Sequence, residues 1–306
     1  MTTQLLPELL DYFATAHPRS LRGVEEAIRV SPQRITEIAE MFLGWLFKID
    51  GTDGVKRAAD AFVQFSSDVN LAQARYEASG SYENKSFSDV YANHYSQSET
   101  MNGYLWGIYL TNFLWAHHTE ISLMFADTFL TKLPEAAQLV EIAPGHGGWG
   151  AWALSRLPQG RLQGFDISPS SIEIAKSVTR AAGVGDRATY SECDALDLSQ
   201  MPQEIADALI CSFLVEHLER PELLFGVVRH LLKPRGIGFV TGALTAAQVD
   251  HIYEFRYESE LVKMCEDQGL RVLQTLSVGP TRTLPNPRFL PRSMALIVQK
   301  RCGKYF

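Results

Sequence analysis

The sequence of 306 residues contains only four cysteines, and no two of them have CxxC spacing. They are Cys193, Cys211, Cys265 and Cys302. This scarcity argues against a disulfide framework and a zinc site, so we expect no bound metal. The sequence also lacks the ~20 uninterrupted apolar residues that a membrane-spanning helix needs. Its first residues have no basic flank or apolar core typical of a secretory signal, so we expect a cytoplasmic protein with no membrane partner.

An excess of positive charge is missing as well. There are 28 Lys and Arg against 35 Asp and Glu, which gives a formal net charge of −7. Proteins that bind nucleic acids usually carry a basic footprint, so we do not expect a nucleic-acid partner. With 46% hydrophobic and 21% charged residues, the composition is that of an ordinary folded protein. The length suits one α/β domain and an appendage of about 100 residues.

The N-terminal part, residues 1–80, has the pattern of a helical domain. Ser31 and Pro32 are typical of a helix start, and apolar residues then recur every three or four positions. The pairs Asp50-Gly51 and Asp53-Gly54 predict a turn. Residues 81–132 are rich in large aromatic side chains, and 101–129 are apolar enough for one or two buried helices. We interpret 81–132 as a connector or lid over a substrate pocket, although such an aromatic stripe is also typical of a plain core.

From residue 138 onward, short strands alternate with helices, which predicts a parallel sheet covered on both faces. The predicted strands are 138–142, 161–166, 188–192, 206–212, 236–241, 271–276 and 294–298, with the last one antiparallel. The predicted helices are 149–155, 171–182, 222–232 and 257–268. We therefore expect an α/β domain with a seven-stranded sheet in residues 133–306.

A glycine-rich turn follows the first predicted strand, in the run LVEIAPGHGGWG of residues 139–150. Glycines in such a turn allow a cofactor to approach the backbone closely. Asp166 ends the second strand, 25 residues after Glu141, where a carboxylate can accept hydrogen bonds from ribose hydroxyls. These two features leave nicotinamide, flavin and S-adenosylmethionine open as cofactors. Asp194, after the third strand, is placed to accept a hydrogen bond from an adenine amino group.

Together with residues 207–218 and 231–236, these blocks resemble class I S-adenosylmethionine-dependent methyltransferases in order and spacing, over residues 135–300. The resemblance implies a Rossmann-like sheet and S-adenosylmethionine as the cofactor. By resemblance, Glu141 lies near the methionine amino group, Asp166 holds the ribose, and Asp194 flanks the adenine. The full set of cofactor-binding residues that it implies is Glu141, Ala143, Pro144, Gly145, Gly147, Asp166, Ile167, Asp194, Ala195, Ser212 and Phe213.

One residue departs from the pattern of this family. Ala143 stands where the family usually has glycine, and its methyl group can be tolerated if its backbone dihedrals are ordinary. The turn has no clean GxGxxG motif and contains Pro144, which disfavours a dinucleotide oxidoreductase.

Catalytic residues are expected just after the fourth strand, at the carboxyl edge of the sheet. Methyl transfer depends on positioning, and a hydroxyl acceptor also needs a base. Glu216 and His217 are the candidates, although many methyltransferases carry a Glu-His pair there without a role in proton transfer. Adjacent His117 and His118 point about 100° apart on a helix, so at most one should face a given pocket. The candidates for acceptor binding are Tyr91, His94, Tyr95, Tyr253 and Tyr257.

The sequence thus predicts an enzyme that methylates oxygen, nitrogen or carbon of a small acceptor of the natural-product kind. Two alternatives remain: a cyclisation or decarboxylation on the same fold, and a non-catalytic partner subunit. Residues 1–80 resemble the helical dimerisation domain of small-molecule O-methyltransferases, which implies a homodimer. DNA binding by a winged helix is the rival interpretation of these residues.

Overall fold

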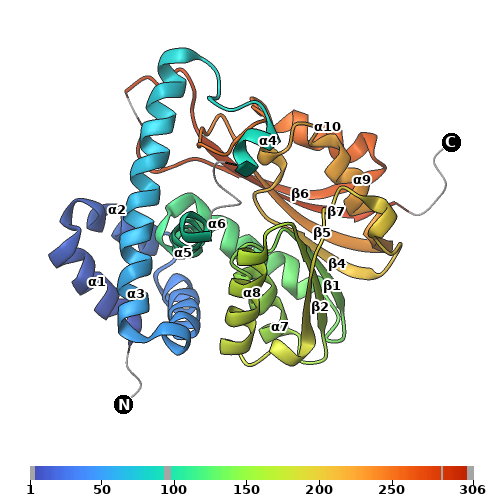
Figure 1. Ribbon diagram of the computed structural model, residues 1–306, viewed down its shortest axis with the longest axis horizontal. Coiled ribbons are helices and arrows are strands. Elements are labelled where there is room, and N and C mark those ends of the chain that lie inside the picture. The colour runs from blue at the N-terminus through green and yellow to red at the C-terminus, as the bar shows by residue number, and fades with distance from the viewer. Residues whose placement is uncertain (1–3, 93–97, 284, 302–306) are drawn as a thin grey trace.

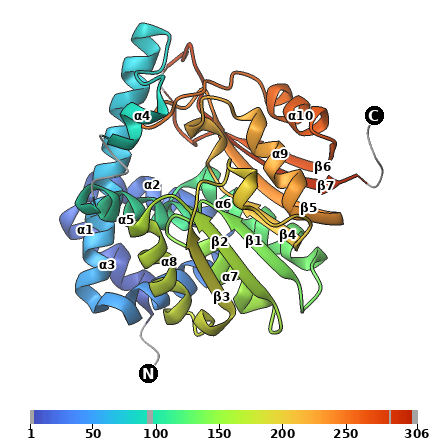
Figure 2. The ribbon, with the colours of Figure 1, turned by 45° about the vertical axis from the view of Figure 1, so that its right-hand side comes forward.

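The structure, a computed structural model, describes residues 4–92, 98–283 and 285–301. Figures 1 and 2 show a group of N-terminal helices beside an α/β unit built on one twisted sheet. The helices before the sheet are α1 (Leu5–Ala16), α2 (Pro18–Arg29), α3 (Pro32–Ser79), α4 (Phe87–Val90), α5 (Ser98–Leu114) and α6 (Ala116–Met124). A π-helical turn, Phe125–Phe129, follows α6 and leads toward the first strand.

Helix α3 begins after Ser31, with Pro32 in its first turn, as the sequence predicted. It bends sharply at Gly51, whose φ of 65° and ψ of −162° lie outside the helical region. Only glycine adopts such dihedrals readily, so the Asp50-Gly51 pair sets the bend. The predicted turn is a bend inside one helix: Gly51 leaves the helical region, whereas Asp53 and Gly54 are helical. Beyond it, the second half of α3 runs along the side of the molecule (Figure 1).

The sheet has seven strands in the order β3-β2-β1-β4-β5-β7-β6, and only β7 runs antiparallel to its neighbours. The strands are β1 (Gln138–Ile142), β2 (Arg161–Asp166), β3 (Ala188–Glu192), β4 (Ala206–Cys211), β5 (Leu232–Leu244), β6 (Leu270–Val278) and β7 (Arg292–Lys300). The predicted α/β class and seven-stranded sheet are confirmed. Strand β5 is longer than predicted, because it begins at Leu232 and passes an irregularity in its pairing with β4 before Ile237.

Helices cover both faces of the sheet. They are α7 (Gly148–Arg156), α8 (Pro169–Ala181), α9 (Glu222–Leu231) and α10 (Glu258–Asp267). Successive residues of β4 point to opposite faces, so Ile210 packs with α7, α8 and the N-terminal helices, while Leu209 packs with α9 and α10. The two layers are visible in Figure 2.

The N-terminal helices share the core of the first face. Phe42 of α3 lies 5.7 Å, ring to ring, from Trp152 of α7, and Phe125 lies 5.1 Å from Phe239 of β5. Both phenylalanines are fully buried. One hydrophobic cluster therefore runs from α1 to β7.

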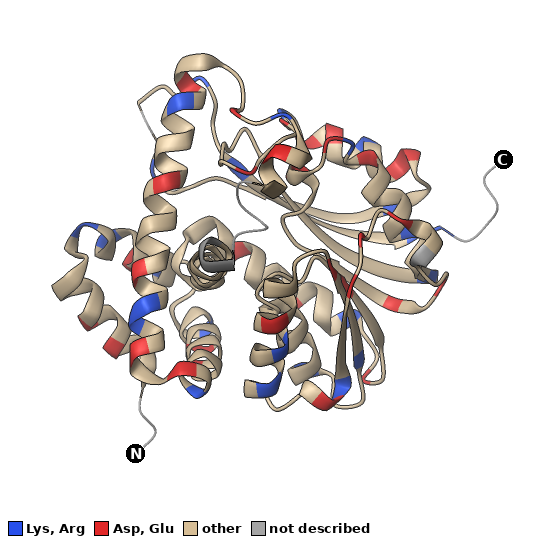
Figure 3. Cartoon of the chain, in the orientation of Figure 1, with Lys and Arg blue, Asp and Glu red and all other residues tan. Residues whose placement is uncertain are grey.

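Charged residues lie mainly on the outside of the helices. Figure 3 shows acidic and basic residues interspersed along α3 and α8. In the described part of the chain, no helix combines the length and the apolar character needed to cross a bilayer.

Candidate active site

A cavity of about 770 Å³ opens at the carboxyl ends of the central strands. Its wall on the sheet side includes Glu141, Asp166 and Phe213, which follow or end β1, β2 and β4. Its other wall comes from α3, α5 and the start of α6. Ligands of open α/β sheets bind at this edge.

The turn after β1 is tight and strained at one point. Ala143, Gly145 and Gly147 have φ values of 49°, 54° and 68°. The dihedrals of Ala143 are therefore not ordinary, and a side chain in the left-handed region costs roughly 1–2 kcal/mol. Gly147 serves packing, because a Cβ there would lie 2.6 Å from Ala175 of α8.

Asp166 ends β2 and is buried at the cavity. One of its carboxylate oxygens accepts a hydrogen bond from the amide of Gly145 (3.2 Å), and the other accepts one from the amide of Ser168 (2.9 Å). Burial raises the pKa of Asp166 to about 6, against these two hydrogen bonds, which lower it. The carboxylate thus ties the glycine-rich turn to the end of β2.

Glu141, on β1, is also buried beside the turn. Its Oε1 accepts a hydrogen bond from the amide of Gly150 (3.2 Å), while its Oε2 has no hydrogen-bond partner among the described residues. Burial raises the pKa of Glu141 to about 8. A buried carboxylate oxygen without a partner is unfavourable, so this position suits a cationic group of a ligand.

The other predicted cofactor residues divide into two groups. Ala143, Pro144, Ile167, Ser212 and Phe213 line the cavity. Asp194 and Ala195 follow β3 outside this lining, and Asp194 accepts a hydrogen bond from the amide of Leu196 (2.9 Å). The Phe213 ring stacks on that of His118 at 4.7 Å.

Glu216 and His217 lie in a 3₁₀ turn after β4, and both line the cavity. The Nδ1 of His217 is 3.0 Å from the backbone oxygen of Asp250 and 3.6 Å from its carboxylate. The His251 ring packs edge-on against His217 at 4.9 Å, and the Tyr104 hydroxyl hydrogen-bonds to Asp250. Five polar side chains therefore form one buried cluster.

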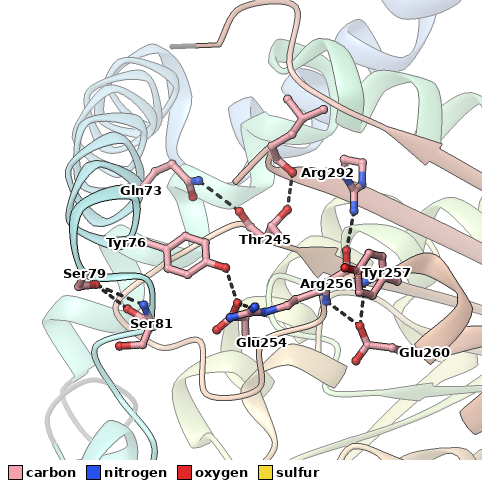
Figure 4. A network of polar contacts seen from close by, with 11 residues as sticks. Gln73, Tyr76, Ser79, Ser81, Thr245, Glu254, Arg256, Tyr257, Glu260 and Arg292 are labelled. Atoms are coloured by element: carbon pink, nitrogen blue, oxygen red, sulfur yellow. Dashed lines mark hydrogen bonds and ion pairs between the residues drawn. The ribbon is translucent and has the colours of Figure 1, made fainter. Parts of the chain in front are cut away.

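The segment that carries Asp250 and His251 is held in place by the second half of α3 (Figure 4). The Gln73 side chain donates a hydrogen bond to the backbone oxygen of Thr245 (3.2 Å) and accepts one from the amide of Ala247 (2.9 Å). Tyr76 donates a hydrogen bond to Glu254, which also pairs with Arg256 at 2.6 Å. The buried cluster thus depends on contacts between parts of the chain that are far apart in sequence.

Most of the predicted acceptor-binding tyrosines lie elsewhere. Tyr91 and Tyr257 are exposed, Tyr253 packs on Phe255, and none of the three is part of the cavity lining. His94 and Tyr95 fall outside the residues that the structure describes.

Two histidines at the start of α6 contribute more than the sequence suggested. His117 and His118 both line the cavity, so the expectation that at most one would face it is wrong. Burial lowers the pKa of His117 to about 4 and that of His118 well below its usual value, so both rings are neutral at pH 7. The cavity is large enough to reach two faces of the same helix turn.

Residues 139–236 match the model of a family described as a methyltransferase domain. This part of the chain is a methyltransferase domain. The structure of an O-methyltransferase family protein from Burkholderia thailandensis is similar to this methyltransferase, with a TM-score of 0.55 and 16% identity. That match covers 83% of this chain and 74% of the other, so it extends beyond residues 133–306 into the N-terminal helices.

A second similar structure is phosphoethanolamine N-methyltransferase 2 of Haemonchus contortus, in complex with S-adenosyl-L-methionine. Its TM-score is 0.54 at 15% identity, over 72% of this chain and 61% of that one. At such identities the likeness concerns the fold. No curated protein matches this methyltransferase in sequence.

S-adenosylmethionine is the cofactor of this methyltransferase domain, and the cavity has groups that fit it. The unpartnered Oε2 of Glu141 suits the methionine ammonium group, and Asp166 at the strand end suits ribose hydroxyls.

Proposed function

We propose that this chain transfers the methyl group of S-adenosylmethionine to an oxygen atom of a small acceptor. One observation carries the proposal: the cofactor turn and the buried Glu216–His217 pair line the same cavity. S-adenosylmethionine supplies an electrophilic methyl group on a sulfonium, and a hydroxyl acceptor must lose a proton as it attacks. A group that takes this proton is needed for oxygen and not for an already electron-rich carbon.

In this proposal, the two ends of the cavity have different roles. Asp166 holds the ribose, Glu141 holds the methionine ammonium group, and Asp194 contacts the adenine from outside the cavity lining. The residues assigned to the cofactor are Glu141, Ala143, Pro144, Gly145, Gly147, Asp166, Ile167, Asp194, Ala195, Ser212 and Phe213. Glu216 and His217 lie at the acceptor end and activate the acceptor.

Aromatic side chains at the acceptor end favour an uncharged, flat or apolar acceptor of the natural-product kind. Phe65, Trp115 and Phe213 line the cavity with the neutral rings of His117 and His118. Trp115 stacks on Phe65 at 5.4 Å and on His117 at 5.2 Å. Flat rings prefer such offset or edge-on neighbours, so an aromatic acceptor extends the existing stack.

The direct test is transfer of isotopically labelled methyl from S-adenosylmethionine to a panel of phenols, hydroxy-polyketides, amines and carbon nucleophiles. We expect a phenolic or alcoholic product heavier by ~14 Da, with S-adenosylhomocysteine released in equal amount. The variant Asp166→Ala should bind the cofactor about 10- to 100-fold more weakly, as expected for lost hydrogen bonds to a charged group. Asp186→Ala, which changes an exposed aspartate, is the control.

Other outcomes of that test identify the rival functions. A product of unchanged mass, or one that has lost carbon dioxide, would support cyclisation or decarboxylation. A chain that does not bind S-adenosylmethionine in calorimetry would be a non-catalytic subunit.

We also propose that two chains pair through residues 1–80. The apolar faces of α1 to α3 pack within their own chain, so the pairing would use outer residues such as Phe47 and Leu71, which are 41% and 51% exposed. Sedimentation of the wild type and of Leu71→Glu tests this: a monomeric wild type contradicts it.

A further inference from the structure

The buried cluster at the acceptor end has the composition of a metal site. One potential ligand atom from each of Glu216, His217 and His251 lies within 4.8 Å of those from the other two. All three residues are buried. Glu216 and His217 follow β4 and His251 follows the neighbouring strand β5, so the sheet brings together residues 34 positions apart in sequence.

The hydrogen bonds of the two histidines fix which ring nitrogen can bind a ligand. The Nδ1 of His217 lies 3.0 Å from the backbone oxygen of Asp250, and the Nδ1 of His251 lies 2.7 Å from that of Ala246. A carbonyl oxygen only accepts, so Nδ1 must carry the hydrogen on both rings. In the neutral form, the lone pair is then on Nε2. Histidines that bind metals are oriented by hydrogen bonds of this kind.

Glu216 supplies the third donor. Its side chain is fully buried, and no side chain of the described residues donates a hydrogen bond to its carboxylate. The charged groups that act on it are His217 and Asp250, with no Lys or Arg of the described residues among them. An ionised carboxylate buried in this way is unfavourable by several kcal/mol unless a cation neutralises it. A divalent ion would be balanced by Glu216 together with the nearby Asp250.

The segment that carries His251 is anchored on both sides. Gln73 bonds to the backbone of Thr245 and Ala247, and Tyr76 bonds to Glu254, as Figure 4 shows in part. His251 is therefore held near the end of β4 before any ligand binds. A site that is organised in advance loses less conformational freedom on binding.

We propose that Glu216, His217 and His251 bind a zinc ion, with the open coordination position facing the cavity. Two imidazole nitrogens and one carboxylate are a donor set that suits Zn²⁺ and does not suit Mg²⁺ or Ca²⁺. Zinc–ligand distances of about 2.1 Å place neighbouring ligands about 3.4 Å apart. The potential ligand atoms lie within 4.8 Å of one another, so the cluster has to contract for an ion to bind.

This inference rests on the proposed function and gives the cluster a defined part in it. The acceptor hydroxyl occupies the open position, where the zinc ion lowers its pKa and its proton leaves to solvent. The acceptor oxygen then forms the new O–C bond, the S–C bond breaks, and sulfur keeps the electron pair. Glu216 and His217 thus activate the acceptor as metal ligands and not as a lone base.

Metal binding is measured first, without reference to activity. The purified full chain is stripped with a chelator, and Zn²⁺ or Co²⁺ is added in competition with a chromophoric chelator. We expect one ion per chain, a visible Co²⁺ spectrum of low coordination number, and affinity at least about 100-fold weaker in Glu216→Gln and His251→Asn. His230→Asn, which changes a partly buried histidine bonded to the backbone of Met201, should bind as the wild type does.

Calorimetry with S-adenosylmethionine checks that the variants are folded, because their cofactor rim is unchanged. A wild-type chain that binds neither Zn²⁺ nor Co²⁺ overturns the metal site, as does equal binding in His251→Asn. If the stripped chain still methylates its acceptor at the full rate, the metal inference fails and the proposed function stands. If the metal binds but no acceptor is methylated, the proposed function fails instead.

Discussion

At the scale of single residues, Ala143 holds a conformation that suits glycine better. Its φ of 49° places a methyl group in the left-handed region, and its amide is fixed by a hydrogen bond to the backbone of Phe165 (2.8 Å). We expect Ala143→Gly to raise the free energy of unfolding by about 1 kcal/mol, because the strain is removed. Urea denaturation measures this. The buried helical Ala151 is the control, and Ala151→Gly should lower stability by about the same amount. A loss of stability in both variants would contradict the assignment of strain to Ala143.

Glu141 should make the stability of the chain depend on pH. Its folded pKa of about 8 lies above the ordinary value of 4.5, so the folded state binds the additional proton between these values. The free energy of unfolding therefore falls as pH rises, by on the order of 3 kcal/mol between about pH 5 and pH 8. Glu141→Gln should reduce this slope in urea titrations without cofactor, leaving the part that Asp166 and Glu216 contribute, because burial raises the pKa of both as well. Glu135→Gln, at an exposed position, should keep the full slope, and a slope unchanged in Glu141→Gln would show that Glu141 does not cause it.

The residues of the site differ in how far the sequence could reveal them. Glu141, Asp166 and Glu216 follow or lie on buried strands, and such positions are recognisable from local pattern. Tyr104 and Asp250 carry no local signal, because each lies in an ordinary run of sequence and joins the cluster only through contacts across α5 and the segment after β5. The strain at Ala143 could likewise be recognised only from the backbone dihedrals in the structure.

At the scale of elements, the glycine at the bend of α3 is required by its dihedrals. Gly51 lies at φ 65° and ψ −162°, a region that other residues hardly use. Gly51→Ala should lower the free energy of unfolding by about 1–3 kcal/mol. Gly44, in the same helix, has a helical conformation and open space where a Cβ would lie, so Gly44→Ala should raise stability by up to about 1 kcal/mol. Changes of opposite sign in the free energy of unfolding, measured by chemical denaturation, would support the requirement for glycine at the bend. Equal changes in the two variants would argue against it.

The existence of the strands was predicted more reliably than the residues at which they begin and end. The runs 138–142, 161–166 and 188–192 coincide with β1, β2 and β3. Strand β5 was predicted too short, because Pro234 and Gly236 are typical of turns. In the structure, Leu232 pairs with Ala206 before the irregularity, so tertiary pairing overrides the local signal.

At the scale of the whole molecule, the N-terminal helices and the sheet form one hydrophobic cluster. The division into residues 1–80, 81–132 and 133–306 stays a prediction. Phe42 packs on Tyr109 and Phe113 of α5 and on Trp152 of α7. This cluster predicts that the chain unfolds as one unit.

Phe42→Ala tests that prediction. Truncation of a fully buried phenylalanine should lower the free energy of unfolding by about 3–5 kcal/mol, with a single transition seen in both near- and far-ultraviolet circular dichroism. Leu223, on α9 and 40% exposed, is the control, and Leu223→Ala should change stability far less. Two separate transitions, with only the first shifted by Phe42→Ala, would show that the helices fold independently.

The attachment of α3 to the segment after β5 has a consequence for how such enzymes diverge. In the proposed function, the cofactor is held by the turn after β1 and by β2. The placement of His251 depends on Gln73 and Tyr76, which belong to a helix outside the sheet. Exchange of residues along that helix can therefore change which compound is accepted without changing how the methyl donor is recognised. A lineage can in this way acquire new chemistry at one end of the cavity and inherit the other end intact.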